Sequence, residues 1–325
     1  MAALADESSK SGEIVDLRHF TASHLNRVLD EEIAEWNTKL HWDFSCSAAL
    51  VRKYADTRSL AGFALVDRGE IAGYGYTVLE DHKGLIGDIF VRAAWRDGEA
   101  EARIFRALFD SLTRSPGLSR IESQLMLIEH DIARTLRRDR FVRLFERLLL
   151  SLDPEKLPPI KPGSGNPRYY LEEWRDHHRE TAATVISLAY INHIDARIND
   201  QYLTLSGARR FLNNIVEFPG CGIFEPTASF VAFDRAAGSV AGIVLSSSVG
   251  DGVAHIAQIC VTPRVRGTGL GYELLRHAVD RLKRAGARKI TLTVTASNAE
   301  AARLYERFGF REIRRFNAYV WEEAL

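Results

Sequence analysis

The strongest constraint on the fold of this chain is an internal repeat. Residues 89–112 (IFVRAAWRDGEAEARIFRALFDSL) align without a gap to residues 259–282 (ICVTPRVRGTGLGYELLRHAVDRL), at a constant offset of 170 residues (259 minus 89). Six identical pairs fall in segments typical of a strand, a loop and a helix: Ile89/Ile259, Val91/Val261, Arg96/Arg266, Arg106/Arg276, Asp110/Asp280 and Leu112/Leu282. A match that crosses three kinds of structure favours a duplicated domain over chance similarity.

A proline-rich stretch separates the two copies. Five of the nine prolines lie within residues 154–167, and this composition disfavours both helix and strand, as a linker does. The predicted organisation is a flexible tail over 1–13, a first domain over 14–152, a linker over 153–168 and a second domain over 169–325.

Hydrophobic periodicity predicts a mixed α/β sheet with helices on its faces in each copy. In the second copy the predicted strands cover 168–174, 229–233, 240–247, 253–261, 289–295 and 316–324. The predicted helices cover 177–198, 204–216, 270–286 and 298–308.

Composition narrows the class of protein. Lys+Arg and Asp+Glu both number 43, so the basic surplus typical of nucleic-acid binders is missing. The polar N-terminus lacks the apolar core of a signal peptide, and no apolar run could span a bilayer, so we expect a cytoplasmic protein without a membrane partner.

Three widely spaced cysteines fit no metal motif, and we expect no metal. A monomer and a homodimer are both open.

The glycine-rich loop before the helix at 270–286 indicates an anion site. The amino end of a helix offers unpaired N–H groups and the positive end of its dipole. Glycines at 267, 269 and 271 remove the Cβ atoms that would keep an anion away. Glycine-rich loops also occur without a ligand, so the loop alone does not establish an anion site and independent evidence is needed.

The second signal is a resemblance to a family. The stretch 259–275 (ICVTPRVRGTGLGYELL) resembles the acetyl-CoA-binding segment of the GCN5-related N-acetyltransferases (GNAT), whose signature is Q/R-x-x-G-x-G/A. Two registers fit, and the distance from Val261 favours the one that begins at Arg266. Residues 298–310 (NAEAARLYERFGF) are similar to a later segment of the same family. The resemblance covers 169–325 and implies a tandem GNAT fold, an arrangement similar to that of mycothiol synthase.

The resemblance implies that acetyl-CoA is the donor and CoA a product. The backbone of Ile259, Cys260 and Val261 is then expected to pair with the pantetheine arm, which Asn298 also contacts. The diphosphate is expected on the loop residues Arg266, Gly267, Thr268, Gly269, Leu270 and Gly271.

The family pattern also implies catalytic residues. Tyr305 stands at the general-acid position, where it would donate a proton or hydrogen bond to the departing thiolate. His255, six residues before Val261, is the candidate base, with a core histidine as the competing interpretation. A weaker hypothesis places the acceptor against the polar segment that holds Asp195, Asn199 and Tyr202. Cys221 and Cys260 are assigned no catalytic role.

The first copy lacks the equivalent site residues. Gly267, Gly269 and Gly271 align with Asp97, Glu99 and Glu101, and Tyr305 aligns with Leu136. Carboxylates repel a diphosphate, so we expect the first copy to be structural.

The predicted function is acetyl-CoA-dependent N-acetylation of a small-molecule or peptide amine by the second domain. Two alternatives stay open at this point: a non-catalytic acetyl-CoA sensor, and an enzyme that acylates oxygen or uses longer acyl chains.

Overall fold

The computed structural model describes residues 12–139, 141–157, 165–218, 220 and 222–323. Most of the predicted tail, the middle of the predicted linker and Cys221 lie outside these residues. The chain divides into two compact units. Unit 1 comprises Met1–Glu35, Ala48–Leu144 and Asn317–Leu325, and unit 2 comprises Trp36–Ser47 and Phe145–Phe316.

Unit 1 is built on a mixed sheet with the strand order β1-β2-β3-β4-β5-β13. The first four strands are antiparallel, β4 and β5 are parallel, and the end of β13 lies antiparallel to β5. The strands are β1 (Glu13–Asp16), β2 (Gly62–Asp67), β3 (Glu70–Glu80), β4 (Lys83–Val91), β5 (Arg120–Leu125) and β13 (Arg311–Glu322).

Unit 2 repeats this plan with the strand order β6-β12-β11-β10-β9-β7. Here β11 and β12 are the parallel pair, and the other neighbours are antiparallel. The strands are β6 (Arg143–Leu152), β7 (Tyr169–Glu173), β8 (Ile223–Phe224), which pairs with β10, β9 (Phe230–Asp234), β10 (Ser239–Gly250), β11 (Val253–Val261) and β12 (Lys289–Thr295). The predicted mixed α/β sheet is thus present in both units.

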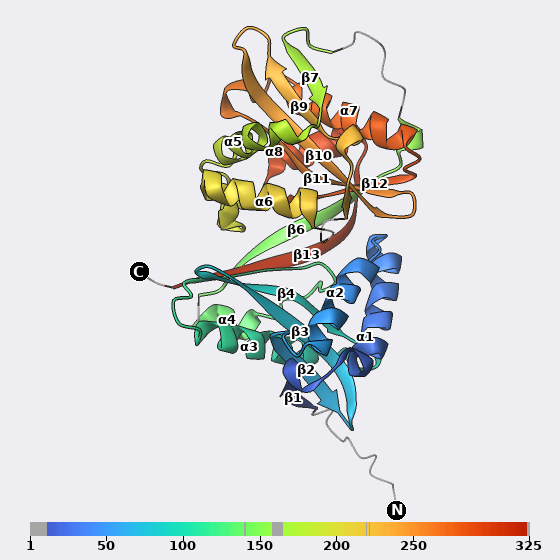
Figure 1. The fold of residues 1–325 in the computed structure, drawn as a ribbon, viewed down its shortest axis with the longest axis vertical. Coiled ribbons are helices and arrows are strands. Elements are labelled where there is room, and N and C mark those ends of the chain that lie inside the picture. The colour runs from blue at the N-terminus through green and yellow to red at the C-terminus, as the bar shows by residue number, and fades with distance from the viewer. Residues whose placement is uncertain (1–11, 140, 158–164, 219, 221, 324–325) are drawn as a thin grey trace, which may run out of the picture. The chain divides into compact units, whose positions relative to one another are not determined.

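Helices cover both faces of each sheet (Figure 1). In unit 1 they are α1 (Ala22–Glu35), α2 (Ser45–Asp56), α3 (Glu99–Thr113) and α4 (Arg134–Asp139). In unit 2, α5 (Arg179–Ala189) and α6 (Leu205–Glu217) pack on one face, and α7 (Leu270–Arg284) and α8 (Ala299–Phe308) pack on the other. The helix predicted over 177–198 already ends at Ala189, and the positive φ of 58° at Asn192 is incompatible with its continuation.

The packing of the helices supports the repeat. Buried positions in α3 and α7 recur at the offset of 170 seen in the sequence. The pairs are Ala100/Leu270, Ile104/Leu274, Phe105/Leu275, Leu108/Ala278, Phe109/Val279 and Leu112/Leu282. Their spacing of three to four residues forms one apolar stripe on each helix, so the repeated sequence encodes the same contact with the sheet.

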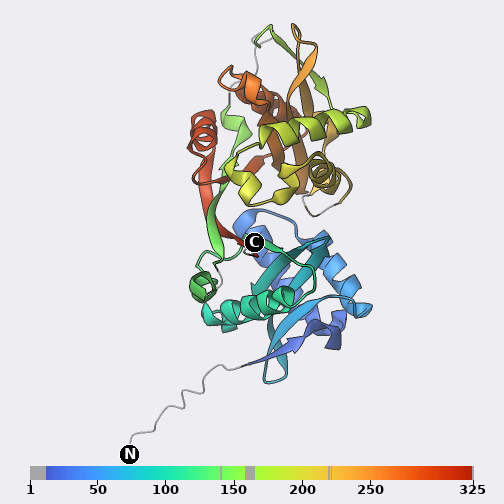
Figure 2. The ribbon, with the colours of Figure 1, turned by 90° about the vertical axis from the view of Figure 1, so that its left-hand side faces the viewer.

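The last strands of the two repeats are exchanged. β6 ends the first repeat in the sequence but pairs with β12 in unit 2, where Leu149 lies opposite Thr293. β13 ends the second repeat, and its final six residues pair with β5 in unit 1. Both figures show β6 and β13 running side by side (Figures 1 and 2), as the strand order requires. The compact units therefore differ from the predicted boundaries at 152 and 169.

This exchange predicts how a cleaved chain behaves. A protease site placed within 158–164 and cut in the native protein should leave both fragments in one species. Each sheet would keep a strand from the other fragment, held by a full ladder of hydrogen bonds. Size-exclusion chromatography in native buffer tests this, with the uncut protein as control. Elution as two separate fragments would contradict the exchange.

Candidate active site

The two parallel strands of unit 2 pair over only part of their length. Val253–Ile256 of β11 pair with Lys289–Leu292 of β12, and in the described residues the pairing ends there. β11 continues to Val261 and β12 to Thr295, so the strands part at their carboxyl ends. An irregularity between Leu245 and Ser246 in the pairing of β10 with β11 lies beside this point. Among the residues that the structure describes, the opening leaves one edge of β11 without a neighbouring strand along the predicted residues Ile259, Cys260 and Val261.

The glycine loop follows β11 and leads into α7. Gly267 and Gly269 have φ angles of 75° and 87°, a region that side chains with a Cβ rarely adopt, and Gly269 is the N-cap residue of α7. A Cβ on either residue would meet no atom within 4 Å, and one on Gly271 would meet only Leu304 at 3.9 Å. The space beside these glycines at the amino end of α7 is therefore open.

Other residues fix the loop in place. The hydroxyl of Thr268 donates to the Val265 carbonyl over 2.7 Å and accepts from the hydroxyl of Tyr169 at 3.1 Å. The guanidinium of Arg266 donates to the Ala189 carbonyl at the end of α5 over 2.5 Å. Leu270 is buried and anchors the first turn of α7 in the core. The loop thus has a defined conformation in which its glycines face open space.

The corresponding loop of unit 1 is closed by its own side chains. Asp97 accepts hydrogen bonds from the N–H groups of Glu99 and Ala100 over 3.1 and 3.0 Å, and Glu101 accepts from Gly98 over 3.2 Å. Glu101 is buried and also pairs with Arg96 at 3.7 Å. Two carboxylates of the chain itself therefore occupy the helix end where an external anion would bind.

A polar cluster lies at the parted end of β12. Arg147, on β6, donates to Thr295 over 3.0 Å and to Thr293 over 3.3 Å. Asp195 accepts a hydrogen bond from Thr295 and lies 3.4 Å from the Arg147 guanidinium. The predicted acceptor residue Asp195 is thus part of this cluster. Arg147 was not predicted from the sequence as a site residue. The feature that could have indicated it is a charged side chain within the largely apolar strand RLFERLLLSL.

Tyr305 lies close to this cluster. It sits on α8 with 7% of its surface exposed, and its ring packs edge-on against Phe310. Burial, the negative charge of Asp195 and the nearby Cys260 thiol raise the pKa of Tyr305, which Arg147 partly offsets. The phenol therefore keeps its proton at neutral pH, which a hydrogen-bond donor requires. Burial likewise raises the pKa of Cys260 to about 12, so its thiol is not ionised at neutral pH.

Two predicted site residues cap short helical segments. Asn199 accepts from the N–H of Gln201 over 3.0 Å, and Asn298 accepts from that of Ala301 over 3.3 Å. The amide of Asn298 also lies 3.3 Å from the His193 ring, and His193 is two residues from Asp195. Tyr202 stacks on Tyr190 with ring centres 4.1 Å apart. The predicted acceptor residue whose described contacts join it to the polar cluster is Asp195.

His255 is enclosed at the paired end of β11. Its Nδ1 lies 2.9 Å from the hydroxyl of Thr291, which in turn donates to the Ala254 carbonyl. This chain of bonds assigns the proton to Nδ1 and the lone pair to Nε2. The ring lies 5.0 Å from that of Trp42, and burial lowers the pKa of His255 to about 4. It is neutral at pH 7, as a base must be, but a weak proton acceptor.

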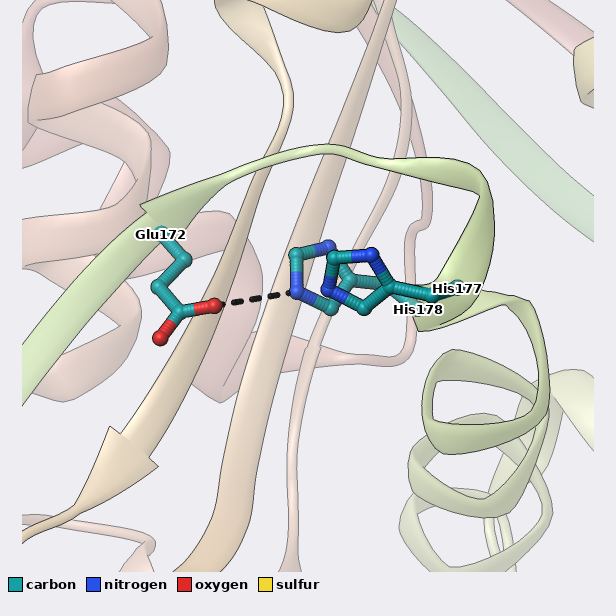
Figure 3. A group of neighbouring side chains, drawn as sticks. All are labelled: Glu172, His177 and His178. Carbon is teal, nitrogen blue, oxygen red and sulfur yellow. Dashed lines mark hydrogen bonds and ion pairs between the residues drawn. The ribbon is translucent and has the colours of Figure 1, made fainter.

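One group of possible metal ligands occurs in the described residues: Glu172, His177 and His178 (Figure 3). The Nδ1 of His178 accepts a hydrogen bond from the backbone N–H of Arg175 over 3.0 Å. The ring proton is therefore on Nε2, which donates to Glu172 over 3.1 Å. A metal ion at Nε2 would have to displace that proton. We assign His178 the role of joining β7 to the start of α5.

A family model identifies the segment that carries these features. The model of the acetyltransferase (GNAT) family matches residues 199–310. This segment belongs to the GNAT family. The family resemblance predicted from the glycine loop and the segment around Tyr305 is therefore confirmed.

Curated relatives of the GNAT segment match over short stretches. A mycothiol acetyltransferase of Mycobacterium sp. (strain JLS) is 33% identical over 91 residues, which is 27% of this chain and 30% of that protein. The [ribosomal protein bS18]-alanine N-acetyltransferase of Escherichia coli (strain K12) is 41% identical over 75 residues, 23% of this chain and 50% of that protein. The matches thus span half or less of these relatives.

Solved structures extend the likeness to both units. A GCN5-related N-acetyltransferase from Sphaerobacter thermophilus has a TM-score of 0.65 and 17% identity, and covers 98% of this chain and 97% of its own. A tandem GNAT protein from the clavulanic acid biosynthesis pathway has a TM-score of 0.59 and 15% identity, and covers 96% of this chain and 99% of its own. At these identities the likeness shows the fold, which is a tandem duplication of the GNAT fold.

None of the helices in the described part of the chain combines the length and the apolar character that crossing a membrane requires.

Burial of His255 predicts a pH-dependent stability. The unfolded histidine binds a proton near pH 6.5 and the folded one only near pH 4, so the folded state loses about 3 kcal/mol of stability as pH falls through that window. His255→Gln should shrink the loss. Urea midpoints at pH 7 and pH 4.5 test this, with the exposed His177→Gln as control. Equal losses in His255→Gln and wild type would contradict the assignment.

Proposed function

We propose that unit 2 is an acetyl-CoA-dependent N-acetyltransferase whose acceptor is a small-molecule or peptide amine, and that unit 1 has a structural role. The proposal rests on three features of unit 2 that lie together. An open helix end, at Gly267–Gly269, follows a strand that has parted from its neighbour, and a protonated phenol lies close to the parted strand. The curated relatives include proteins named as a mycothiol acetyltransferase and as a [ribosomal protein bS18]-alanine N-acetyltransferase.

The residues present fit the donor. The diphosphate would accept hydrogen bonds from the backbone of the loop from Arg266 to Gly271, where the open glycines allow close approach. The amide groups of the pantetheine arm would pair with the free edge of β11 at Ile259–Val261, as an added strand does. Together these contacts direct the thioester toward the polar cluster at the end of β12.

The chemical step joins nitrogen to carbon and breaks the carbon–sulfur bond. The neutral amine attacks the thioester carbonyl, the C–N bond forms, the amine loses a proton, and the sulfur departs as a thiolate. Tyr305 donates a hydrogen bond or its proton to that sulfur, because it stays protonated at neutral pH. Its raised pKa favours hydrogen bonding over complete transfer, since a thiol has a pKa near 8.5.

His255 stays the predicted base in this proposal. Its Nε2 lone pair would accept the amine proton through water. Because the pKa of the enclosed His255 ring is low, proton transfer from the amine to this ring is only weakly favourable. In this scheme desolvation, which favours the neutral form of the amine, supplies the rest of its activation.

Tyr305→Phe separates the enzyme from a sensor that only binds acetyl-CoA. Removal of the hydroxyl should lower kcat by roughly 100-fold or more, the usual range for loss of a general acid. The affinity for CoA should change little, because the phenol is proposed to meet only the departing sulfur. Calorimetry with CoA and thiol release from acetyl-CoA provide the two measurements. Unchanged turnover would remove Tyr305 from the mechanism.

Gly271→Glu tests the anion site by copying unit 1, where the equivalent Glu101 caps its own helix. We expect CoA affinity to fall by roughly 100-fold, because a carboxylate would take the phosphate donors and repel the phosphates. Gly271→Ala is the matched control, since its Cβ would make only an ordinary contact with Leu304. The melting temperature should change little in both. Wild-type affinity in Gly271→Glu would place the diphosphate elsewhere.

A further inference from the structure

We propose that Arg147 is a specificity-determining residue that binds a carboxylate on the acceptor amine, so that the preferred acceptors are amino acids or peptides with a free carboxylate near the amine. This inference rests on the proposed function of unit 2. It deepens that function by naming the chemical class of the acceptor.

The bonding of Arg147 is incomplete for a buried cation. Its side chain is 11% exposed, and a guanidinium has five N–H groups to place. The nearer acceptors are the neutral hydroxyls of Thr293 and Thr295, at 3.3 and 3.0 Å. Its Nε is buried and has no hydrogen-bond partner among the described residues. A buried N–H without an acceptor costs free energy, which a ligand oxygen would recover.

The single carboxylate beside Arg147 in its described contacts is a loose partner. Asp195 lies 3.4 Å from Nη1, longer than a good charge-assisted hydrogen bond, and its Oδ1 also accepts from Thr295. Arg147 and Asp195 can therefore each still bind a ligand group of the opposite charge. An ammonium would approach Asp195, and a carboxylate would approach the guanidinium fork.

The location of the pair suits an acceptor. Thr293 and Thr295 lie on the part of β12 that has separated from β11, where the acyl group is proposed to arrive. Asp195 and Arg147 both act on the phenol of Tyr305, the first raising and the second lowering its pKa, so both charges lie near the reacting end. A simple cationic amine would meet repulsion from Arg147 there, whereas a zwitterion would have a partner for each charge.

Arg147 belongs to the first repeat of the sequence. It lies on β6, outside residues 199–310 that match the family model. The equivalent residue of the second repeat, one offset of 169 later (147 plus 169), is Phe316 on β13. The cation is therefore present in the first repeat and replaced by an apolar residue at the equivalent position of the second.

The test compares acceptors that differ only in the carboxylate. The full-length protein, saturated with CoA, is titrated by calorimetry with glycine, β-alanine, glutamate and alanyl-alanine, and with the corresponding amides. Thiol release from acetyl-CoA is measured on the same panel. Variants are Arg147→Gln, Arg147→Lys, which keeps the charge without the fork, and Arg143→Gln, an exposed position on the same strand, as control. Melting temperatures confirm that each variant is folded.

We expect at least one acid to bind and to be preferred over its amide. Arg147→Gln should weaken that acid by roughly 10- to 100-fold, the usual loss for a charged hydrogen bond, and change its amide by less than about 3-fold. Arg147→Lys should lie between, and Arg143→Gln should match wild type.

Three outcomes are decisive. Amides that bind as well as or better than acids would overturn the inference, and so would failure of every acid on the panel to bind. Acids that bind through Arg147 without any thiol release would uphold the carboxylate site while overturning the N-acetyltransferase function.

Discussion

The parting of β11 from β12 is the constraint on which the rest of unit 2 depends. Two parallel strands that pair through Ile256 and Leu292 and then separate expose backbone groups that a continuous sheet would satisfy. On β12, beyond this point, the side-chain hydroxyls of Thr293 and Thr295 accept hydrogen bonds from Arg147. On β11 the backbone groups along the free edge at Ile259–Val261 can pair with an added extended segment. The glycine loop begins directly beyond this edge, so one local separation places an anion site and a polar cluster within reach of a single extended ligand.

The two units differ at one pair of equivalent helix ends. The helices α3 and α7 bury equivalent residues against equivalent sheets, so their packing does not distinguish them. The difference lies at their first turns. In unit 1, Asp97 and Glu101 satisfy the N–H groups from within the chain, while in unit 2 glycines leave that end open. A carboxylate held in the same molecule binds without the entropy cost that an external ligand meets, which stabilises a closed state.

Local sequence signals predicted the local structure well. The offset of the repeat reproduced the buried stripe of α7, and the glycines predicted the positive φ angles of the loop. Long-range pairing could not be predicted, because strands of similar composition fit either sheet and only their tertiary partners decide. The exchange of β6 and β13 depends on such long-range pairing and was therefore not predicted from the sequence. The low pKa of His255 also depends on enclosure by Trp42, a residue more than two hundred positions away in the chain.

The exchange gives the duplication a physical consequence. Unit 2 includes β6, a strand encoded by the first repeat, and without it β12 would be an unpaired edge along Thr293 and Thr295. The same strand carries Arg147 into the polar cluster beside Asp195. Sequence change in the first repeat can therefore alter the charge near the proposed reaction site of the second, while the donor loop and Tyr305 stay as they are. In the proposed mechanism, the donor loop and Asp195 are thus encoded by the second repeat and Arg147 by the first.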